Sequence, residues 1–167
     1  NGQMVYGHDG FAGELGHTCA VRHNGRQCNC GKVGCLETYA SAIGVARTAR
    51  EWLDMSDEPS TLRSLEVITS KDVYDAAISG DAIAKKVFEF TGQKLGESFS
   101  DFVAFSRPEA IILFGGLAEA GDLIMKPIVE AMEANLLGIW KGGKVKILRS
   151  GLKESDAAIL GAGALAW

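Results

Sequence analysis

One histidine and three cysteines near the start of the chain carry side chains that bind transition metals. They are His17, Cys28, Cys30 and Cys35. An imidazole and three thiolates complete the tetrahedral ligand set of a structural zinc site and leave no position for water or a substrate. Gly31 and Gly34 separate the last two cysteines and allow the tight turns of a metal-binding loop. The pattern predicts a loop that zinc makes rigid.

The same residues allow other interpretations. Cys35 could form a disulfide with one partner, although Cys28 and Cys30 are too close in sequence to bridge each other without strain, and the thiols could also be unrelated. His23 is an alternative fourth ligand, but its His-Asn-Gly-Arg context is typical of an exposed turn. Cys19 lies in a segment that we interpret as a short strand, 18–21, where it would be a small buried hydrophobe.

Two glutamates, Glu14 and Glu37, flank the metal ligands without being needed by the metal. An ionised carboxylate accepts hydrogen bonds and does not donate them, so it suits a ligand that is rich in hydroxyl groups. A metal held between the two would fix both carboxylates closely enough to form a binding site. They are therefore the first candidates for ligand binding.

Residues 10–17 (GFAGELGH) and 28–41 (CNCGKVGCLETYAS) together resemble the signature of the ROK family, which comprises bacterial sugar kinases and sugar-responsive repressors. The resemblance continues at 111–117 (IILFGGL) and 156–162 (DAAILGA), so it spans nearly the whole chain.

This resemblance implies a role for each residue of the site. The family's zinc ligands match His17, Cys28, Cys30 and Cys35, and its sugar-contacting residues match Glu14, His17 and Glu37. His17 would then face the metal with one ring nitrogen and the sugar with the other. ATP and Mg2+ are the implied co-substrates in a kinase of this family, and a hexose is the implied substrate.

The paired glycines Gly115 and Gly116 end an apolar segment that precedes a predicted helix. Such a turn lets a nucleotide approach the backbone, although many α/β turns need glycine for chain reversal alone. The resemblance to the family's adenosine motif favours nucleotide binding. The family more often has a third glycine where Leu117 stands, which would narrow the space near the adenine or ribose.

Several family motifs are missing from this sequence. ROK kinases begin with an Asp-Gly-Gly-Thr phosphate loop, carry a catalytic aspartate after an asparagine, and have a second glycine-rich loop upstream of the zinc region. Here the chain opens on Asn1-Gly2, a hairpin signal, with 3–6 as the expected second strand. We interpret the chain as the C-terminal half of a longer protein, without a catalytic residue of its own and inactive alone.

Composition places the chain among ordinary globular domains. Of its 167 residues, 47% are hydrophobic and 23% charged, and the net charge is -4. Acidity argues against a nucleic-acid surface in this segment, and no apolar run approaches the roughly 18 residues of a membrane span. Thiolate ligands favour a reducing, cytoplasmic setting.

Helices are predicted over 36–53, from Thr69 or Ser70 through 77 with an Asp72 capping box, and from Asp81 to about 106 with a broad apolar face. A polar loop covers 54–59. The later part predicts an apolar strand at 110–114 with both faces covered, a helix at 125–137 with Pro127 in its first turn, a strand at 144–148, and a final helix that Asp156 caps.

The expected architecture is an α/β fold of the actin-like, ribonuclease-H-like type. Residues 1–155 would form a C-terminal lobe with the zinc loop at 17–35, and 156–167 would form a helix that packs on the missing N-terminal lobe. Gly161 and Gly163 fit that expectation, because small residues let another element approach closely. ROK proteins commonly form homodimers, and the long helix from Asp81 is one surface for that.

The resemblance favours part of an ATP-dependent hexose kinase similar to bacterial glucokinases. Kinases for N-acetylmannosamine, N-acetylglucosamine or fructose share the signature and remain open as alternatives. So does the sugar-sensing module of a ROK repressor, whose DNA-binding helices would lie outside this segment. A zinc-stabilised interaction domain without a small ligand is the third alternative.

Overall fold

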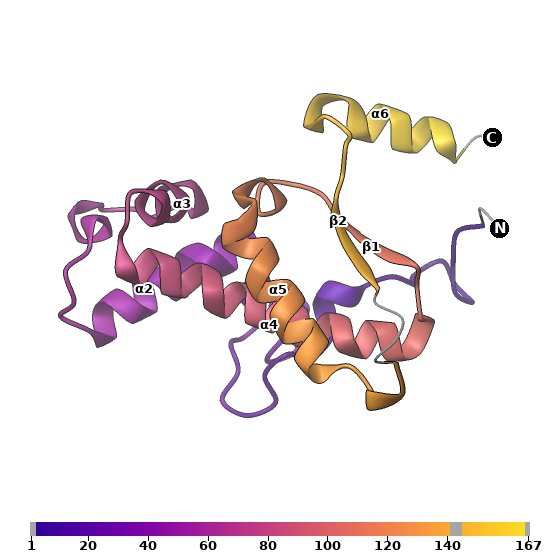
Figure 1. The fold of residues 1–167 in the computed structure, drawn as a ribbon, viewed down its shortest axis with the longest axis horizontal. Helices are drawn as coiled ribbons and strands as arrows, with labels where there is room; N and C mark the ends of the chain where they lie inside the picture. The colour runs from indigo at the N-terminus through magenta and orange to yellow at the C-terminus, as the bar shows by residue number, and fades with distance from the viewer. Residues whose placement is uncertain (1–2, 141–144, 166–167) are drawn as a thin grey trace.

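The long helix α4 lies at the centre of the fold, and the other core helices pack against it. The structure is a computed structural model that describes residues 3–140 and 145–165 (Figure 1). Its α-helices are α1 (Glu37–Ala40), α2 (Ala42–Met55), α3 (Ser70–Ile78), α4 (Ala82–Ser106), α5 (Asp122–Asn135) and α6 (Glu154–Ala164). Its strands are β1 (Ala110–Leu113) and β2 (Lys146–Arg149), and short 3-10 turns complete the list.

Asp81 caps α4, as predicted, and also anchors the segment before it. One carboxylate oxygen accepts a hydrogen bond from the Ala84 amide at 3.0 Å, and the other accepts from Ser60 Oγ at 2.7 Å and the Thr61 amide at 2.8 Å. The predicted apolar face of α4 is buried, with Phe88 and other core side chains at 2% exposure or less. The predicted Thr69–Asp72 capping box of α3 is present as well.

Two glycines of α4 allow α5 to approach its backbone. A Cβ atom on Gly96 would stand 2.4 Å from the Ile128 carbonyl oxygen, and one on Gly92 would stand 2.6 Å from the Pro127 Cβ. Helix α5 begins at Asp122, where an acidic residue favours a helix start, and not at 125 as predicted. Pro127 therefore lies in the second turn and not in the first.

The helix predicted over 36–53 is two helices. Ser41 takes an extended conformation between α1 and α2, and its hydroxyl oxygen accepts a hydrogen bond from the Gly44 amide at 3.0 Å. Serine caps a helix better than it continues one, because its side chain competes for backbone amides. Glu37 thus lies on a one-turn helix of its own.

The sheet is parallel, with Ala110 opposite Lys146 and Leu113 opposite Arg149. One face, including Ile111, packs on the helical core. The other face is not covered by any element of the described residues: Ile112 is 65% exposed and Phe114 is 52% exposed. The prediction that both faces are covered is therefore wrong for this part of the chain. Residue 144, where β2 was expected to begin, lies outside the described residues.

The ends of the chain differ from the predictions in detail. Residues 3–6 form no strand, and Asn1-Gly2 lies outside the described residues. Helix α6 begins at Glu154 after Lys153, so Asp156 lies in its first turn and is not the cap. Figure 1 shows α6 standing apart from the helical core, beyond the sheet. None of the helices in the described ranges is long and apolar enough to cross a membrane.

Candidate zinc, sugar and nucleotide site

The backbone folds residues 17–35, which carry the four candidate metal ligands, into a crossed loop. Gly34 lies beneath the Val21 segment, where its carbonyl oxygen accepts hydrogen bonds from the Ala20 and Val21 amides at 2.8 and 3.1 Å. Its φ of +81° is in the left-handed region that favours glycine. The backbones of Cys19 and Cys35 form an isolated antiparallel β-bridge beside this crossing, in place of the predicted strand at 18–21. This crossing brings His17 to the cysteines.

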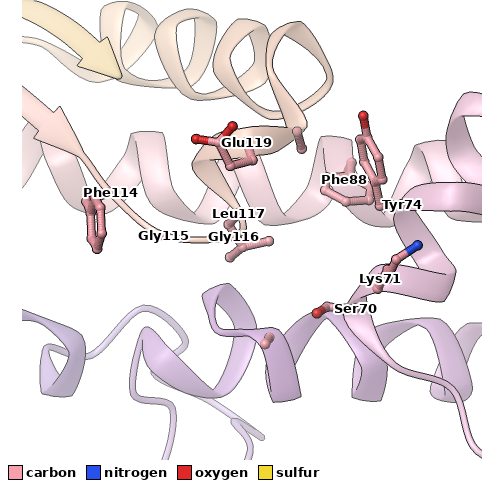
Figure 2. Close-up of a pocket in the computed structure, with 11 residues that line it drawn as sticks. Ser70, Lys71, Tyr74, Phe88, Phe114, Gly115, Gly116, Leu117 and Glu119 are labelled. Atoms are coloured by element: carbon pink, nitrogen blue, oxygen red, sulfur yellow. The ribbon is translucent and has the colours of Figure 1, made fainter. Parts of the chain in front are cut away.

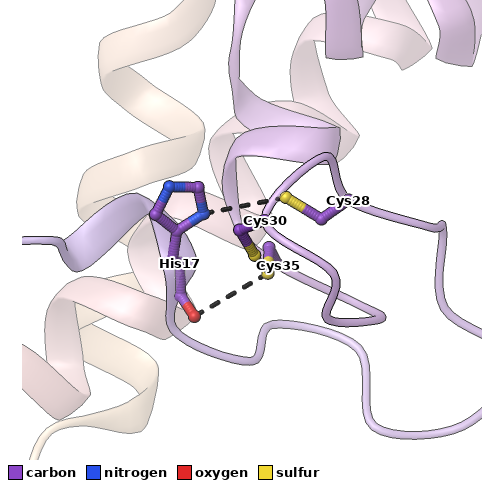
Figure 3. A group of neighbouring side chains, drawn as sticks. All are labelled: His17, Cys28, Cys30 and Cys35. Carbon is purple, nitrogen blue, oxygen red and sulfur yellow. Dashed lines mark hydrogen bonds between the residues drawn. The ribbon is translucent and has the colours of Figure 1, made fainter.

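All four predicted zinc ligands meet in one cluster (Figure 3), with their donor atoms within 4.8 Å of one another. His17 Nδ1 lies 3.7 Å from Cys28 Sγ, and Cys30 Sγ lies 3.6 Å from Cys35 Sγ. A tetrahedron with zinc–sulfur bonds of about 2.3 Å has edges of about 3.8 Å. The donor set and its spacing therefore fit zinc.

The surroundings of the thiols change their acidity. The Cys30 amide acts to lower the pKa of the Cys28 thiol, but burial and hydrogen bonds with nearby thiols and Glu37 raise it to about 12. Burial also raises the pKa of Cys35, whereas the Lys32 amide holds that of Cys30 below its ordinary value. A divalent cation bound between the three cysteines would favour their deprotonated form, because its positive charge stabilises the thiolates.

Both candidate carboxylates lie beside the His17 ring. Glu14 Oε2 is 3.8 Å from Nε2, and Glu37 Oε1 is 3.9 Å from Nδ1 and accepts from Cys28 Sγ at 3.2 Å. Glu14 is exposed and Glu37 is half-buried. The ring thus has one nitrogen toward the cysteines and the other toward Glu14, with open carboxylate oxygens at the rim of the cluster.

Three other residues of this segment lie outside the cluster and differ in their burial. His23 is exposed, as its predicted turn requires, and it lies outside the cluster. Cys19 is exposed, so its predicted burial is wrong. Its backbone pairs with that of Cys35 in one isolated β-bridge, and its free thiol lies at the surface. Arg26, which the sequence placed in the exposed turn, is buried at 8% exposure.

A second concave region lies at the glycine turn after β1 (Figure 2), with a volume of about 500 Å³. Gly115 has a φ of +98°, and nothing lies within 4 Å of a Cβ built on Gly115 or Gly116. Ser70, Lys71 and Tyr74 of α3 also line this cavity. No pattern in the sequence points to these α3 residues, because only the fold brings them beside the turn.

Comparison with known proteins places this arrangement in a family. The ROK family matches over residues 1–167. The chain belongs to the ROK family. A glucokinase of Halalkalibacterium halodurans is 38% identical over 167 residues, covering 98% of this chain and 50% of the glucokinase. The transcriptional regulator NagC of Escherichia coli is 29% identical over 157 residues, covering 94% of this chain and 38% of the regulator.

The fold comparison agrees with this family. The crystal structure of a ROK family glucokinase from Streptomyces griseus in complex with glucose and AMPPNP gives a TM-score of 0.84 at 29% identity. It covers 98% of this ROK chain and 54% of the crystallised chain. The predicted family and the predicted α/β fold of the actin-like type are confirmed. This ROK chain spans about half the length of the curated glucokinases that it matches.

Proposed function

We propose that this chain is the C-terminal part of an ATP-dependent hexose kinase of the glucokinase type, which phosphorylates a sugar hydroxyl. The observation that carries the proposal is the placement of Glu14 and Glu37 on either side of His17, at the rim of the His/Cys cluster. The 38% sequence identity between this chain and a glucokinase supports the same proposal.

In this proposal Glu14, His17 and Glu37 bind the sugar. The carboxylates accept hydrogen bonds from sugar hydroxyls, and Nε2 of His17 contributes a third polar contact on the side of Glu14. His17, Cys28, Cys30 and Cys35 hold a structural zinc ion. The bound metal supplies rigidity and has no open position for the substrate. Fixed acceptors discriminate among sugars, because a hydroxyl that is missing or inverted leaves a carboxylate unpaired.

The nucleotide would lie at the turn of Gly115 and Gly116. Their bare backbone admits a close approach, and the cavity beside them is mostly apolar with Tyr74 and Phe88 at one end and Lys71 near its wall (Figure 2). ATP with Mg2+ would donate its phosphoryl group to the sugar. We expect the base that takes the sugar proton to lie outside this chain, so the chain alone should not catalyse.

We extend the proposal to three properties of the longer protein. Helix α6 packs on a lobe that this sequence does not contain, as predicted for 156–167. The protein forms a homodimer, and its thiolate site belongs in a reducing, cytoplasmic setting. Light scattering on the longer protein tests the dimer directly, since a monomer at all concentrations would contradict it.

A sugar-sensing module of a ROK repressor is the second candidate, and the 29% identity to NagC favours it. The deciding experiment is a coupled ATP-turnover assay on the full-length protein with glucose, N-acetylmannosamine, N-acetylglucosamine and fructose. Turnover with one sugar supports the kinase and names its substrate. Sugar binding without turnover contradicts the kinase and supports the repressor.

A further inference from the structure

Arg26 is a buried cation beside the metal cluster, with its side chain 7% exposed. Residues 22–24, in the turn that precedes it, are exposed, so the chain passes from the surface into the interior at Arg26. A buried guanidinium is costly unless its donors are paired. The pairing of Arg26 is extensive, and it reaches two helices that bear on the candidate sugar site.

The guanidinium spans the junction of α1 and α2. Nη1 donates to the carbonyl oxygens of Thr38 at 2.7 Å and Gly44 at 3.3 Å. Nη2 donates to Thr48 Oγ1 at 2.8 Å and to Glu51 Oε2 at 2.6 Å. The first of these acceptors directly follows Glu37 in sequence, so Arg26 holds the helix turn that presents this carboxylate.

The backbone of Arg26 belongs to the metal loop. Its amide donates to the Tyr39 hydroxyl at 2.8 Å, and its carbonyl oxygen accepts from the Gly34 amide at 2.8 Å. Cys28 follows two positions later, and Cys35 follows Gly34. The guanidinium also stacks over the Tyr39 ring, with its carbon 4.5 Å from the ring centre. Arg26 thus joins both cysteine-bearing arms to α1.

Folding alone does not require an arginine here. Removing Arg26 alone would leave the Glu51 carboxylate unpaired, but an apolar set in place of both members of a buried ion pair often fills the space without loss of stability. What arginine adds is a flat, rigid fork that donates in fixed directions to several acceptors, which lysine cannot reproduce. The contacts of Arg26 set the distance between the loop of residues 17–35 and the helix turn that carries Glu37.

We propose that Arg26 is a positioning residue that locks the metal loop to the α1–α2 junction and so sets both zinc retention and sugar affinity. The sugar part of this inference rests on the proposed function, whereas the zinc part does not. Loss of a residue that holds the ligands of a metal site in position typically costs about 10- to 100-fold in metal affinity or activity.

The test compares Arg26→Lys with Arg50→Lys, a matched control on α2 whose guanidinium donates to the Glu66 carbonyl oxygen, away from the cluster. Zinc-loaded chains are treated with a chromophoric chelator, and zinc release is followed. Arg26→Lys should release zinc about tenfold faster than the wild type, while Arg50→Lys should not differ. Equal release from all three chains overturns the zinc part.

The sugar part is tested in the full-length protein by separate KM values. Arg26→Lys should raise the KM for the sugar about tenfold and leave the KM for ATP within about twofold. A general loss of folded protein would lower kcat and leave both KM values alone. An unchanged sugar KM overturns this part.

A milder variant covers the case in which Arg26→Lys does not fold. Tyr39→Phe keeps the ring under the guanidinium and removes only the hydroxyl that accepts from the Arg26 amide. It should shift zinc release and sugar KM in the same direction by a smaller factor, and no shift in either counts against the inference. If the wild type binds none of the sugars, the proposed function fails, and zinc release alone decides the role of Arg26.

Discussion

Gly34 lies so close to Val21 that a Cβ atom on the glycine would stand 1.9 Å from the Val21 carbonyl oxygen. No real contact of a Cβ atom is that short, so this crossing of the loop exists only because residue 34 has no side chain. The crossing in turn places Cys35 beside the other ligands. Backbone packing at Gly34 therefore contributes to the spacing of the four candidate ligands.

Gly34→Ala should therefore abolish the metal site. The new methyl group forces Val21 and Gly34 apart, which breaks the hydrogen bonds between them and displaces Cys35. Zinc per chain, measured on purified protein, should fall well below the wild-type value. Gly31→Ala is the matched control: Gly31 has a similar φ of +90° but open space around it, so it should cost only about 1–2 kcal/mol of stability and keep zinc. Equal zinc loss in both would contradict this account.

Cys30→Ser should lower the zinc content, because a hydroxyl does not replace a thiolate as a zinc ligand. Cys19→Ser is the control, since Cys19 is exposed and lies outside the cluster. Metal analysis after dialysis should give near one zinc per chain for the wild type and for Cys19→Ser. Zinc retained by Cys30→Ser would remove this cysteine from the ligand set and reopen the question of His23.

Glu37→Gln should weaken sugar binding about 10- to 100-fold, because a hydrogen bond to a charged acceptor is worth roughly 1.5–3 kcal/mol. Zinc content should persist, since the carboxylate is not needed for the tetrahedral set. Titration calorimetry of the full-length protein with the sugar that it turns over gives the affinity. Glu89→Gln, at an exposed position of α4, should match the wild type. A variant that loses zinc and sugar together would make Glu37 a part of the metal site instead.

Local signals in the sequence predicted the parts of the fold that local physics determines. The Thr69–Asp72 capping box, the Asp81 cap and the buried face of α4 follow from side chains within a few positions of one another. The His/Cys3 cluster was predictable for a different reason: one histidine and three cysteines are a recognisable donor set even when they are distant in sequence.

Other features depend on contacts that the sequence does not display. The burial of Arg26 requires Thr48 and Glu51 of α2 to lie beside it, which only the folded loop reveals. The break at Ser41 lies within a continuous helical pattern. Besides the Ser41 cap, it needs the close packing of α1 on α2, where a Cβ on Gly44 would stand 2.7 Å from the Tyr39 carbonyl carbon. The exposed Ile112 looked like a core residue because hydrophobicity does not say which face is covered.

Asp81 should give the chain an acid-sensitive term in its stability. Burial acts to raise the pKa of its carboxyl, but hydrogen bonds from Ala84, Ser60 and Thr61 outweigh it, so the folded pKa lies below the ordinary 3.8. The carboxylate therefore stabilises the fold fully above pH 3.8, and that contribution is lost as the pH falls through the lowered folded value.

Asp81→Asn should accordingly destabilise the chain near neutral pH by about 1–3 kcal/mol. Its amide oxygen can still cap the helix, but its NH2 group cannot accept the hydrogen bonds from Ser60 and Thr61, and the charge is lost. The difference from the wild type, measured by urea unfolding, should shrink below pH 4. Asp101→Asn, at an exposed position of the same helix, should show little difference at either pH. A gap between Asp81→Asn and the wild type that stays constant down to pH 3 would show that the charge is not the cause.

Substitution of Gly161 should affect the stability of this chain differently from that of the longer protein that we propose. Nothing lies within 4 Å of a Cβ built on Gly161 in α6, so Gly161→Ala in the present chain should leave stability unchanged or raise it by up to about 1 kcal/mol. In the full-length protein a packed partner would make the same methyl group cost about 1–3 kcal/mol. Gly96→Ala, which meets α5 in both proteins, should destabilise both. Thermal unfolding of the four variants decides the matter, because a Gly161→Ala change that is harmless in the full-length protein would mean that no lobe packs on this face of α6.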